Sequence, residues 1–294
     1  MKLATYRDGS RDGQLVVVSR DLALAHHASG IASRLQQVLD DWNFLSPQLE
    51  DLSATLNAGK ARHAFAFDPR CCLAPLPRAF QWVLAGAAAG DEPLQHPSDA
   101  LLGPQDEALL PAPRPGLQLQ AGFAVLTGDL PRHATPSQAL ERVRLIVLAH
   151  VWRVPAGAQP AGALAPLAVT PDELGSGWRD GRVRLALRCQ PVFSGPGADP
   201  GGDPAALPSP DFASLLAQVA RVRPVPAGSI VGPRVAPVSA EPAAAPEGQD
   251  GCARSDAWPP AGTVHSEATG PDGSSVFGAL AQRFAFDDGA GSGS

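Results

Sequence analysis

The clearest pattern of apolar and polar positions lies in residues 117–129, with the sequence LQLQAGFAVLTGD. Apolar residues fill every second position from 117 to 125, which is the period that a β-strand imposes on its side chains. The Thr-Gly-Asp step that follows is typical of a turn, because glycine adopts positive φ without strain. The pattern predicts a strand ending in a turn, with Gln120 and Gly122 on one face and about 7 Å apart.

The N-terminal part alternates in a way that predicts a small α+β unit. Two short apolar stretches, residues 2–6 and 14–19, are separated by Asp-Gly pairs and predict two strands joined by a turn. Apolar residues at helical spacing predict amphipathic helices over residues 31–41 and 45–57. Residues 67–82 are rich in proline and predict an extended connector.

The C-terminal part mixes predicted elements with loops. A helix is expected over residues 135–149, where Thr135 is a suitable N-cap, Pro136 fits the first turn and an apolar stripe follows. We also predict a helix over 212–222. Strands are expected over 185–193 and 276–286, flexible segments over 194–210 and 235–262, and a disordered tail over 287–294.

Composition narrows the class of protein. The chain has 294 residues and a net charge of −6, which does not favour a nucleic-acid binder. It contains no run of about 18 apolar residues and no apolar segment of the signal-peptide type, so we expect a cytoplasmic protein without a membrane span. The four cysteines lack the C-x-x-C spacing of a zinc site, and we expect them to be reduced.

Several phrases of the sequence resemble the fumarylacetoacetate hydrolase family, in its bacterial form with a small N-terminal domain. The resemblance runs in order from residue 1 to about residue 283. It implies a β-rich α+β fold, with a small N-terminal domain over residues 1–78 and a roll-like C-terminal domain over 79–286. The matching phrases are MKLATYRDGSRDGQLVVVSRDL (1–22), APLPRAFQW (74–82), LLGP (101–104), FAVLTGDLP (123–131), ATPSQALERVRLIVLA (134–149), LAVTPDELGSGWRDGRVRL (167–185), AGSIVG (227–232) and SVFGAL (275–280).

The resemblance also implies a chemistry. The family cleaves carbon–carbon bonds of β-diketo acids and acylpyruvates, as in tyrosine catabolism, with Mg²⁺ or Ca²⁺ held by four carboxylates and a water-activating histidine oriented by a glutamate. The resemblance places a Glu-x-Glu pair of these carboxylates at Gln120 and Gly122 and the other two near Leu84 and near Val151. None of them is acidic, so no catalytic, metal-binding or cofactor-binding residue is carried over, and no cofactor is expected. Two further family positions also differ: a lysine position holds Gln159, and a Gly-Thr step is replaced over residues 233–235.

Other residues could take the place of the missing ligands. A displaced His96 with Glu92 could act as base and orienting acid, or this segment could be a solvated acidic loop with a surface histidine. His150 could face the site, or be a satisfied or exposed histidine at a helix end. Asp129 could be a ligand or a turn residue. The other acidic residues of the segment are Asp91, Asp99, Asp106 and Glu107.

Other candidate sites match known motifs poorly. Residues 228–232 lack the G-x-S-x-G elbow of hydrolases, and residues 195–197 do not form a dinucleotide-binding loop. The pair Cys71–Cys72 lies beside Arg70 and could be activated, or it could be a structural pair in the connector. The pair His26–His27 is expected at the entry of a helix, where an isolated pair makes a poor metal site.

Three functional hypotheses follow. The chain is an acylpyruvate-cleaving enzyme with substitute ligands, a non-catalytic homologue that forms a homodimer or a mixed dimer with a relative, or a decayed gene product. The enzyme should be stabilised by Mg²⁺ or Ca²⁺, because a ligand that binds the native state raises its stability. The homologue should form an oligomer without a metal response, and the decayed product should not unfold cooperatively.

Overall fold

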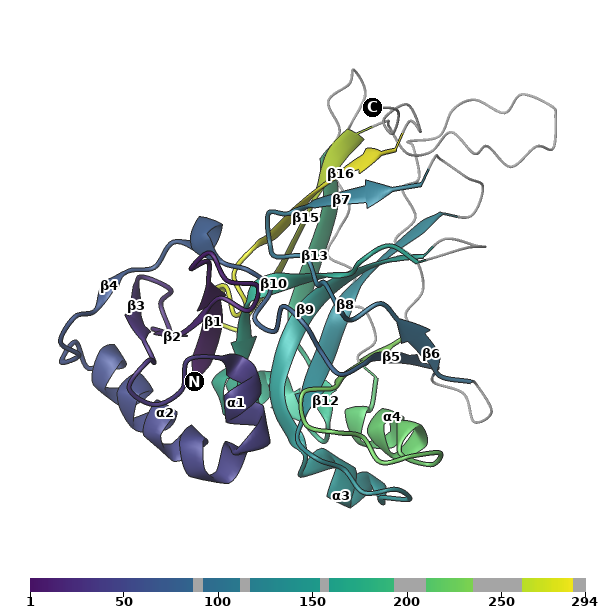
Figure 1. The fold of residues 1–294 in the computed structure, drawn as a ribbon, viewed down its shortest axis with the longest axis horizontal. Coiled ribbons are helices and arrows are strands. Elements are labelled where there is room, and N and C mark those ends of the chain that lie inside the picture. The colour runs from purple at the N-terminus through teal and green to yellow at the C-terminus, as the bar shows by residue number, and fades with distance from the viewer. Residues whose placement is uncertain (87–91, 112–116, 154–158, 193–209, 235–260, 288–294) are drawn as a thin grey trace.

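The computed structural model describes residues 1–86, 92–111, 117–153, 159–192, 210–234 and 261–287 (Figure 1). Most of the segments predicted to be flexible, and nearly all of the predicted tail, lie outside these ranges. Residues 261 and 262 are described and begin a strand.

A ten-stranded mixed sheet organises the fold, and its order is β4-β3-β2-β1-β10-β9-β8-β14-β5-β6. The N-terminal strands join the rest of the sheet through the antiparallel pairing of β1 with β10. The strands of the small N-terminal unit and those of the C-terminal part therefore form one continuous sheet. Its strands are β1 (Lys2–Tyr6), β2 (Gln14–Val18), β3 (Leu24–His27), β4 (Phe65–Ala66), β5 (Trp82–Ala85), β6 (Leu94–His96), β8 (Gln118–Thr127), β9 (Val143–Arg153), β10 (Ala163–Val169) and β14 (Ile230–Pro233).

A second sheet of four strands has the order β13-β15-β16-β7. It packs against the ends of β8 and β9, where Leu119 and Trp152 form a buried cluster with Val264 and Phe284. The strands are β7 (Glu107–Leu110), β13 (Ala186–Val192), β15 (Ala261–Thr269) and β16 (Leu280–Phe286), and a separate pair is formed by β11 (Trp178–Arg179) and β12 (Arg182–Val183).

Helices cover both faces of the large sheet. The helices α1 (Leu35–Asp40) and α2 (Trp42–Asn57) lie over the N-terminal strands and share a core with Leu126 and Leu145. The helix α4 (Phe212–Val219) belongs to the core on the opposite face, together with Phe123 and Val125. The short helix α3 (Pro136–Leu140) lies beside α4, and 3₁₀ turns occur at η1 (Pro69–Cys71) and η2 (Pro171–Gly177).

The strand-rich α+β class predicted from the sequence is confirmed. The predicted strands at 2–6, 14–19, 117–127 and 185–193 correspond to β1, β2, β8 and β13. The predicted strand at 276–286 corresponds to β16, which begins later, at Leu280. The helices at 31–41, 45–57 and 212–222 correspond to α1, α2 and α4, although α1 begins later, at Leu35.

The helix predicted over residues 135–149 is wrong in its second half. Thr135 does cap a helix, since its hydroxyl accepts from Gln138 N, but that helix ends at Leu140. Residues from Val143 onward form β9, which pairs antiparallel with β8. Almost all of β9 is buried, so its apolar residues point to both faces of a covered strand. A continuous apolar run of this kind also fits helical spacing, and periodicity alone does not separate the two.

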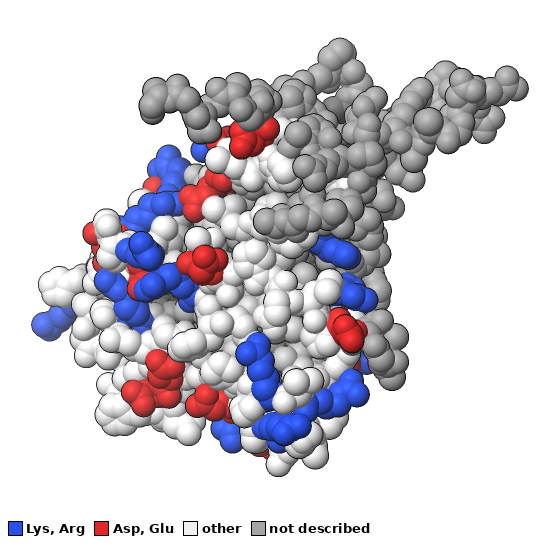
Figure 2. All heavy atoms as spheres, turned by 45° about the vertical axis from the view of Figure 1, so that its right-hand side comes forward, with Lys and Arg blue, Asp and Glu red and all other residues white. Residues whose placement is uncertain are grey.

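Charged side chains are unevenly spread over the surface. On the face drawn in Figure 2, a broad uncharged area lies between a mixed group of acidic and basic residues at the upper left and a mostly basic group at the lower right. Among the described helices, no span has both the length and the apolar character to cross a bilayer.

Candidate functional site

Four neighbouring strands of the large sheet, β9, β8, β14 and β5, form the wall of a small pocket. Register places Gln120 opposite Val151 across β8 and β9, and Leu84 opposite Gly232 across β5 and β14. The four positions that the family resemblance assigned to carboxylates thus meet in one place. The lining residues are Trp82, Leu84, Gln120, Gly122, Phe123, Ala124, Ala149, Val151, Gly232 and Pro233.

The pocket is narrow. Its free volume is about 20 Å³, which is room for about one water molecule. The side chains of Leu84 and Val151 are 4% and 5% exposed. Gly232 lies so close to β8 that an added Cβ would be 3.3 Å from the Cβ of Ala124. Apolar side chains and close strand packing therefore fill the space beside Gly122.

The polar character of the pocket rests on two side chains. Gln120, which is 3% exposed, is the one lining residue with a side-chain oxygen in the part of the chain that the structure describes. Its Oε1 has no hydrogen-bond partner among the described residues, and the same holds for Nε1 of Trp82. A buried amide oxygen or a buried indole N–H that is left without a hydrogen bond lowers the stability of the folded state. A single water molecule in the cavity is the simplest partner that fits.

His96 is not the surface histidine of a solvated loop, so that interpretation is wrong for this residue. It is 6% exposed, on the edge strand β6, and its ring centroid lies 4.9 Å from that of Trp82. Burial lowers the pKa of His96, while its Nδ1 donates to the Pro97 carbonyl at 3.1 Å. Glu92 is exposed, and no described contact joins it to His96. The proposed pair of base and orienting acid is therefore not formed by the described residues; Asp91 lies outside them.

His150 does not face the pocket. It lies on β9, within the strand rather than at a helix end, and points to the opposite face from Val151. Its Nδ1 donates to Oε1 of Gln282 at 3.2 Å, and its Nε2 accepts from Oγ of Ser266 at 2.6 Å. Gln282 Oε1 is an acceptor, so this tautomer of a neutral imidazole is the one that satisfies both contacts. Trp152 Nε1 also donates to Gln282 Oε1, at 3.3 Å.

This cluster has the order of a serine, a histidine and an orienting amide, but it is closed to substrate. Ser266, His150 and Gln282 are each 0% exposed. Burial lowers the pKa of His150 to about 4, so the imidazole is neutral at pH 7. We interpret the cluster as a buried hydrogen-bond network that joins the two sheets. The sequence prediction missed it because β15, which carries Ser266, was not predicted.

The remaining candidates have structural roles. Asp129 is a turn residue whose Oδ1 accepts from Ala227 N at 2.9 Å and so holds the loop before β14. Cys72 is buried, which raises the pKa of its thiol, whereas Cys71 is exposed. His26 and His27 end the strand β3, so the expected helix entry is wrong, and His26 contacts the backbone carbonyls of His27 and Arg62. Among the residues that the structure describes, no three His, Cys, Asp or Glu side chains are grouped closely enough to hold a metal ion.

Comparison with known proteins confirms the family resemblance. Residues 1–78 match the family model of the fumarylacetoacetase N-terminal domain 2. The chain has the fold of the fumarylacetoacetate hydrolase family. A maleylpyruvate hydrolase from Sphingobium sp. SYK-6 superposes with a TM-score of 0.63 at 17% identity, covering 98% of this chain and 100% of that one.

Two further solved structures extend the comparison. The same hydrolase in complex with manganese(II) and pyruvate gives a TM-score of 0.64 at 16% identity, again over 98% and 100% of the two chains. A probable 2-hydroxyhepta-2,4-diene-1,7-dioate isomerase from Mycobacterium abscessus gives 0.62 at 16%, over 98% and 100%. A search among curated proteins found no match. These neighbours carry hydrolase and isomerase names, and at such identities they compare with this chain in fold alone.

Proposed function

We propose that this chain is a non-catalytic protein with the fumarylacetoacetate hydrolase fold, which acts by association rather than by metal-dependent cleavage. The observation that supports this most directly is the lining of the pocket on β5, β8, β9 and β14. The family positions for the metal ligands converge there, and they hold leucine, glutamine, glycine and valine.

The donor set does not fit a divalent cation. Mg²⁺ takes an octahedron of oxygen ligands at about 2.0–2.1 Å, and Ca²⁺ takes about six to eight oxygens. Among the side chains of the described lining residues there is one neutral amide oxygen, from Gln120, and no carboxylate. Loss of a partner that merely orients a metal ligand costs about 10–100-fold in affinity. Replacement of every carboxylate leaves no negative charge to offset dehydration of the ion.

The same fold does support metal and keto-acid binding in a relative. The maleylpyruvate hydrolase neighbour was solved with manganese(II) and pyruvate. Our proposal is that this chain has retained the scaffold of such proteins without the charged lining. In this sense we propose that the chain is a degenerate member of that fold.

Association is the activity that the rest of the surface favours. The strand β7 is an outer strand of the four-stranded sheet, and its Leu109 side chain is 69% exposed. An exposed edge strand with an apolar side chain is suited to pairing with another chain. The uncharged area in Figure 2 agrees with this, because interface centres are depleted in charged residues. A second copy of the chain or an active relative is the partner that we propose.

An enzyme remains the second candidate because of one observation. Gln120 Oε1 and Trp82 Nε1 are buried polar atoms at the pocket and have no partner among the described residues. Buried polar atoms without a protein partner can be satisfied by an ordered water or by a polar group of a ligand. This alternative is a hydrolase or isomerase that acts on a keto acid; the hypothesis of a decayed gene product also remains open.

Three measurements on the purified chain separate these possibilities. Light scattering after size-exclusion chromatography should give a dimer or larger species, and an assay with maleylpyruvate and millimolar Mg²⁺ or Mn²⁺ should give no turnover above the uncatalysed rate. A monomer would contradict association. Metal-dependent turnover would establish the enzyme, and a non-cooperative thermal transition would favour the decayed product.

A further inference from the structure

A second and larger cavity lies between α1 and the connector that precedes β5. Its volume is about 470 Å³, within the range of about 300–1,000 Å³ that small-molecule sites occupy. It shares no lining residue with the pocket on β5, β8, β9 and β14. We call it the α1 groove; it is lined by Asp12, Arg34, Leu35, Gln36, Gln37, Asp40, Leu76, Pro77, Arg78, Ala79, Phe80 and Asp99.

The floor of the α1 groove is apolar. Leu35 and Leu76 are each 2% exposed and belong to the core beneath α1. Phe80 lies in the lining with its ring 64% exposed, although a ring of this size is usually buried. The groove therefore presents apolar surface and an aromatic face to solvent.

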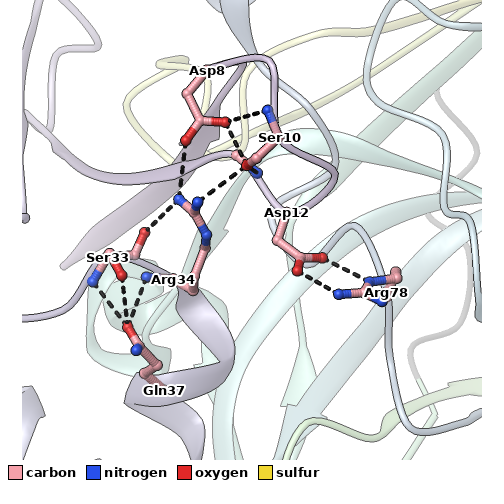
Figure 3. Close-up of polar contacts among 8 residues, drawn as sticks. Asp8, Ser10, Asp12, Ser33, Arg34, Gln37 and Arg78 are labelled. Carbon is pink, nitrogen blue, oxygen red and sulfur yellow. Dashed lines mark hydrogen bonds and ion pairs between the residues drawn. The ribbon is translucent and has the colours of Figure 1, made fainter.

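The two arginines of the groove are already paired with aspartates (Figure 3). Arg78 Nε donates to Asp12 Oδ1 at 2.7 Å, and its Nη2 donates to the second oxygen of the same carboxylate. Arg34 Nη1 donates to Asp8 Oδ2 at 3.2 Å, and its Nη2 donates to Ser10 Oγ at 3.1 Å. Each guanidinium charge is thus balanced by a carboxylate in contact with it.

The other two carboxylates of the groove are not balanced in this way. Asp40 accepts a hydrogen bond at 2.7 Å from the neutral amide of Gln36, which also donates to the Ala227 carbonyl at 3.2 Å. The structure describes no hydrogen bond or ion pair for the Asp99 carboxylate. The two lining arginines are thus occupied by Asp8 and Asp12, whereas the carboxylates of Asp40 and Asp99 have no cationic partner among the described contacts.

The walls of the groove are also held in place. Gln37 Oε1 accepts from the backbone N–H groups of Ser33 and Arg34, at 3.0 and 3.1 Å, and so fixes the first turn of α1 (Figure 3). The contact of Gln36 with Ala227 ties α1 to the loop before β14. A pre-organised cavity loses less conformational entropy when a ligand enters it.

We infer that the α1 groove binds a small organic amine, in which a primary ammonium group is attached to an apolar ring or chain. The ammonium group lies at the unbalanced carboxylates of Asp40 and Asp99. The apolar part lies on the floor and against Phe80, whose ring face also attracts a cation. An organic anion is disfavoured because it meets two carboxylates that have no cationic partner among the described contacts. This inference does not depend on the proposed function, since the pocket at Gln120 plays no part in it.

Three probes with a similar body test the inference by ligand-observed NMR titration of the full chain. They are phenethylamine, phenylethanol and phenylacetate, which carry a cationic, a neutral and an anionic group at neutral pH. We expect phenethylamine to bind at least about threefold more tightly than phenylethanol, and phenylacetate to bind most weakly. Raising the salt concentration should reduce the difference between the three.

Substitutions locate the binding. Asp40→Asn and Asp99→Asn should each weaken phenethylamine binding about two- to fivefold and leave phenylethanol binding unchanged. Phe80→Ala should weaken both probes. Asp51→Asn and Phe44→Ala are the matched controls, because both residues are exposed on α2 and neither lines the groove. Circular dichroism verifies that each variant is folded.

Each possible result either supports or overturns the inference. The expected order of the probes, together with sensitivity to Asp40, Asp99 and Phe80, supports an amine site. Equal affinity for the three probes, tighter binding of phenylacetate or no binding of any probe overturns it. Binding of phenethylamine that is unchanged in the double variant Asp40→Asn/Asp99→Asn also overturns it, because the site would then lie elsewhere.

Discussion

Acidification should weaken the fold through His150. The imidazole is fully buried between the two sheets, and its pKa is lowered from 6.5 to about 4 by that burial. The unfolded chain therefore binds more protons than the folded one between these two pH values. The stabilisation is fully present above about pH 6.5 and is lost as the pH falls towards 4.

The magnitude follows from the size of the shift. One pKa unit corresponds to about 1.36 kcal/mol, so a difference of between two and three units corresponds to about 3 kcal/mol of unfolding free energy. His150→Gln has no titrating ring, so its stability should fall less steeply over the same pH range. At pH 7.5 it should cost about 1–3 kcal/mol, because Ser266 and Gln282 lose their imidazole partner.

Urea unfolding, followed by tryptophan fluorescence at several pH values between 4 and 7.5, measures this directly. The difference between the parent and His150→Gln removes the contributions of carboxylates and of His96, which both forms share. His133→Gln, at an exposed histidine, is the matched control and should follow the parent curve. Parallel pH curves for the parent and His150→Gln would refute the reasoning.

Three other predictions concern packing, capping and thiol chemistry. Gly162→Ala should lower the free energy of unfolding by about 1–3 kcal/mol, measured by thermal unfolding, since the added Cβ would lie 2.4 Å from a ring atom of Trp82. Gly30→Ala is the control and should leave stability unchanged, because an added Cβ there would have no atom within 4 Å. Thr135→Ala should cost about 1 kcal/mol through loss of the cap on Gln138 N, and Ser137→Ala, in the same helix, serves as its control. The third prediction concerns the thiols and uses a Cys252→Ser background. A thiol reagent should label Cys71 rapidly and should label Cys72 and Cys189 slowly, because burial raises the pKa of these two thiols. Rapid labelling that persists after Cys71→Ser would contradict this.

Local sequence patterns were sufficient where an element has one dominant period or a clear cap. The alternation around Gln120 predicted β8, and Thr135 with Pro136 predicted the start of α3. They were insufficient where pairing with a distant strand decides the structure. β14 is a four-residue strand that depends on parallel pairing with β5, almost 150 residues earlier in the chain, and β9 is apolar on both faces.

The location of the candidate site came from the family resemblance, and its geometry came from the structure. The resemblance named Leu84, Gln120, Gly122 and Val151, and the sheet brings these four together. The burial of His96 was not predicted, because Pro93 and Pro97 favoured a loop and the pairing of β6 with β5 is not local. The hydrogen-bond network around His150 was not predicted for a similar reason, because the residues that bond to His150 lie more than 100 positions away in the sequence.

The central claim is that the pocket beside Gly122 does not hold a divalent cation. Isothermal titration calorimetry of the chain with Mn²⁺, Mg²⁺ and Ca²⁺ tests it most directly, with the Sphingobium sp. SYK-6 maleylpyruvate hydrolase as the positive control for Mn²⁺. We predict no saturable heat at millimolar metal and no rise in melting temperature. Binding of one ion per chain, lost on Gln120→Ala, would contradict the account.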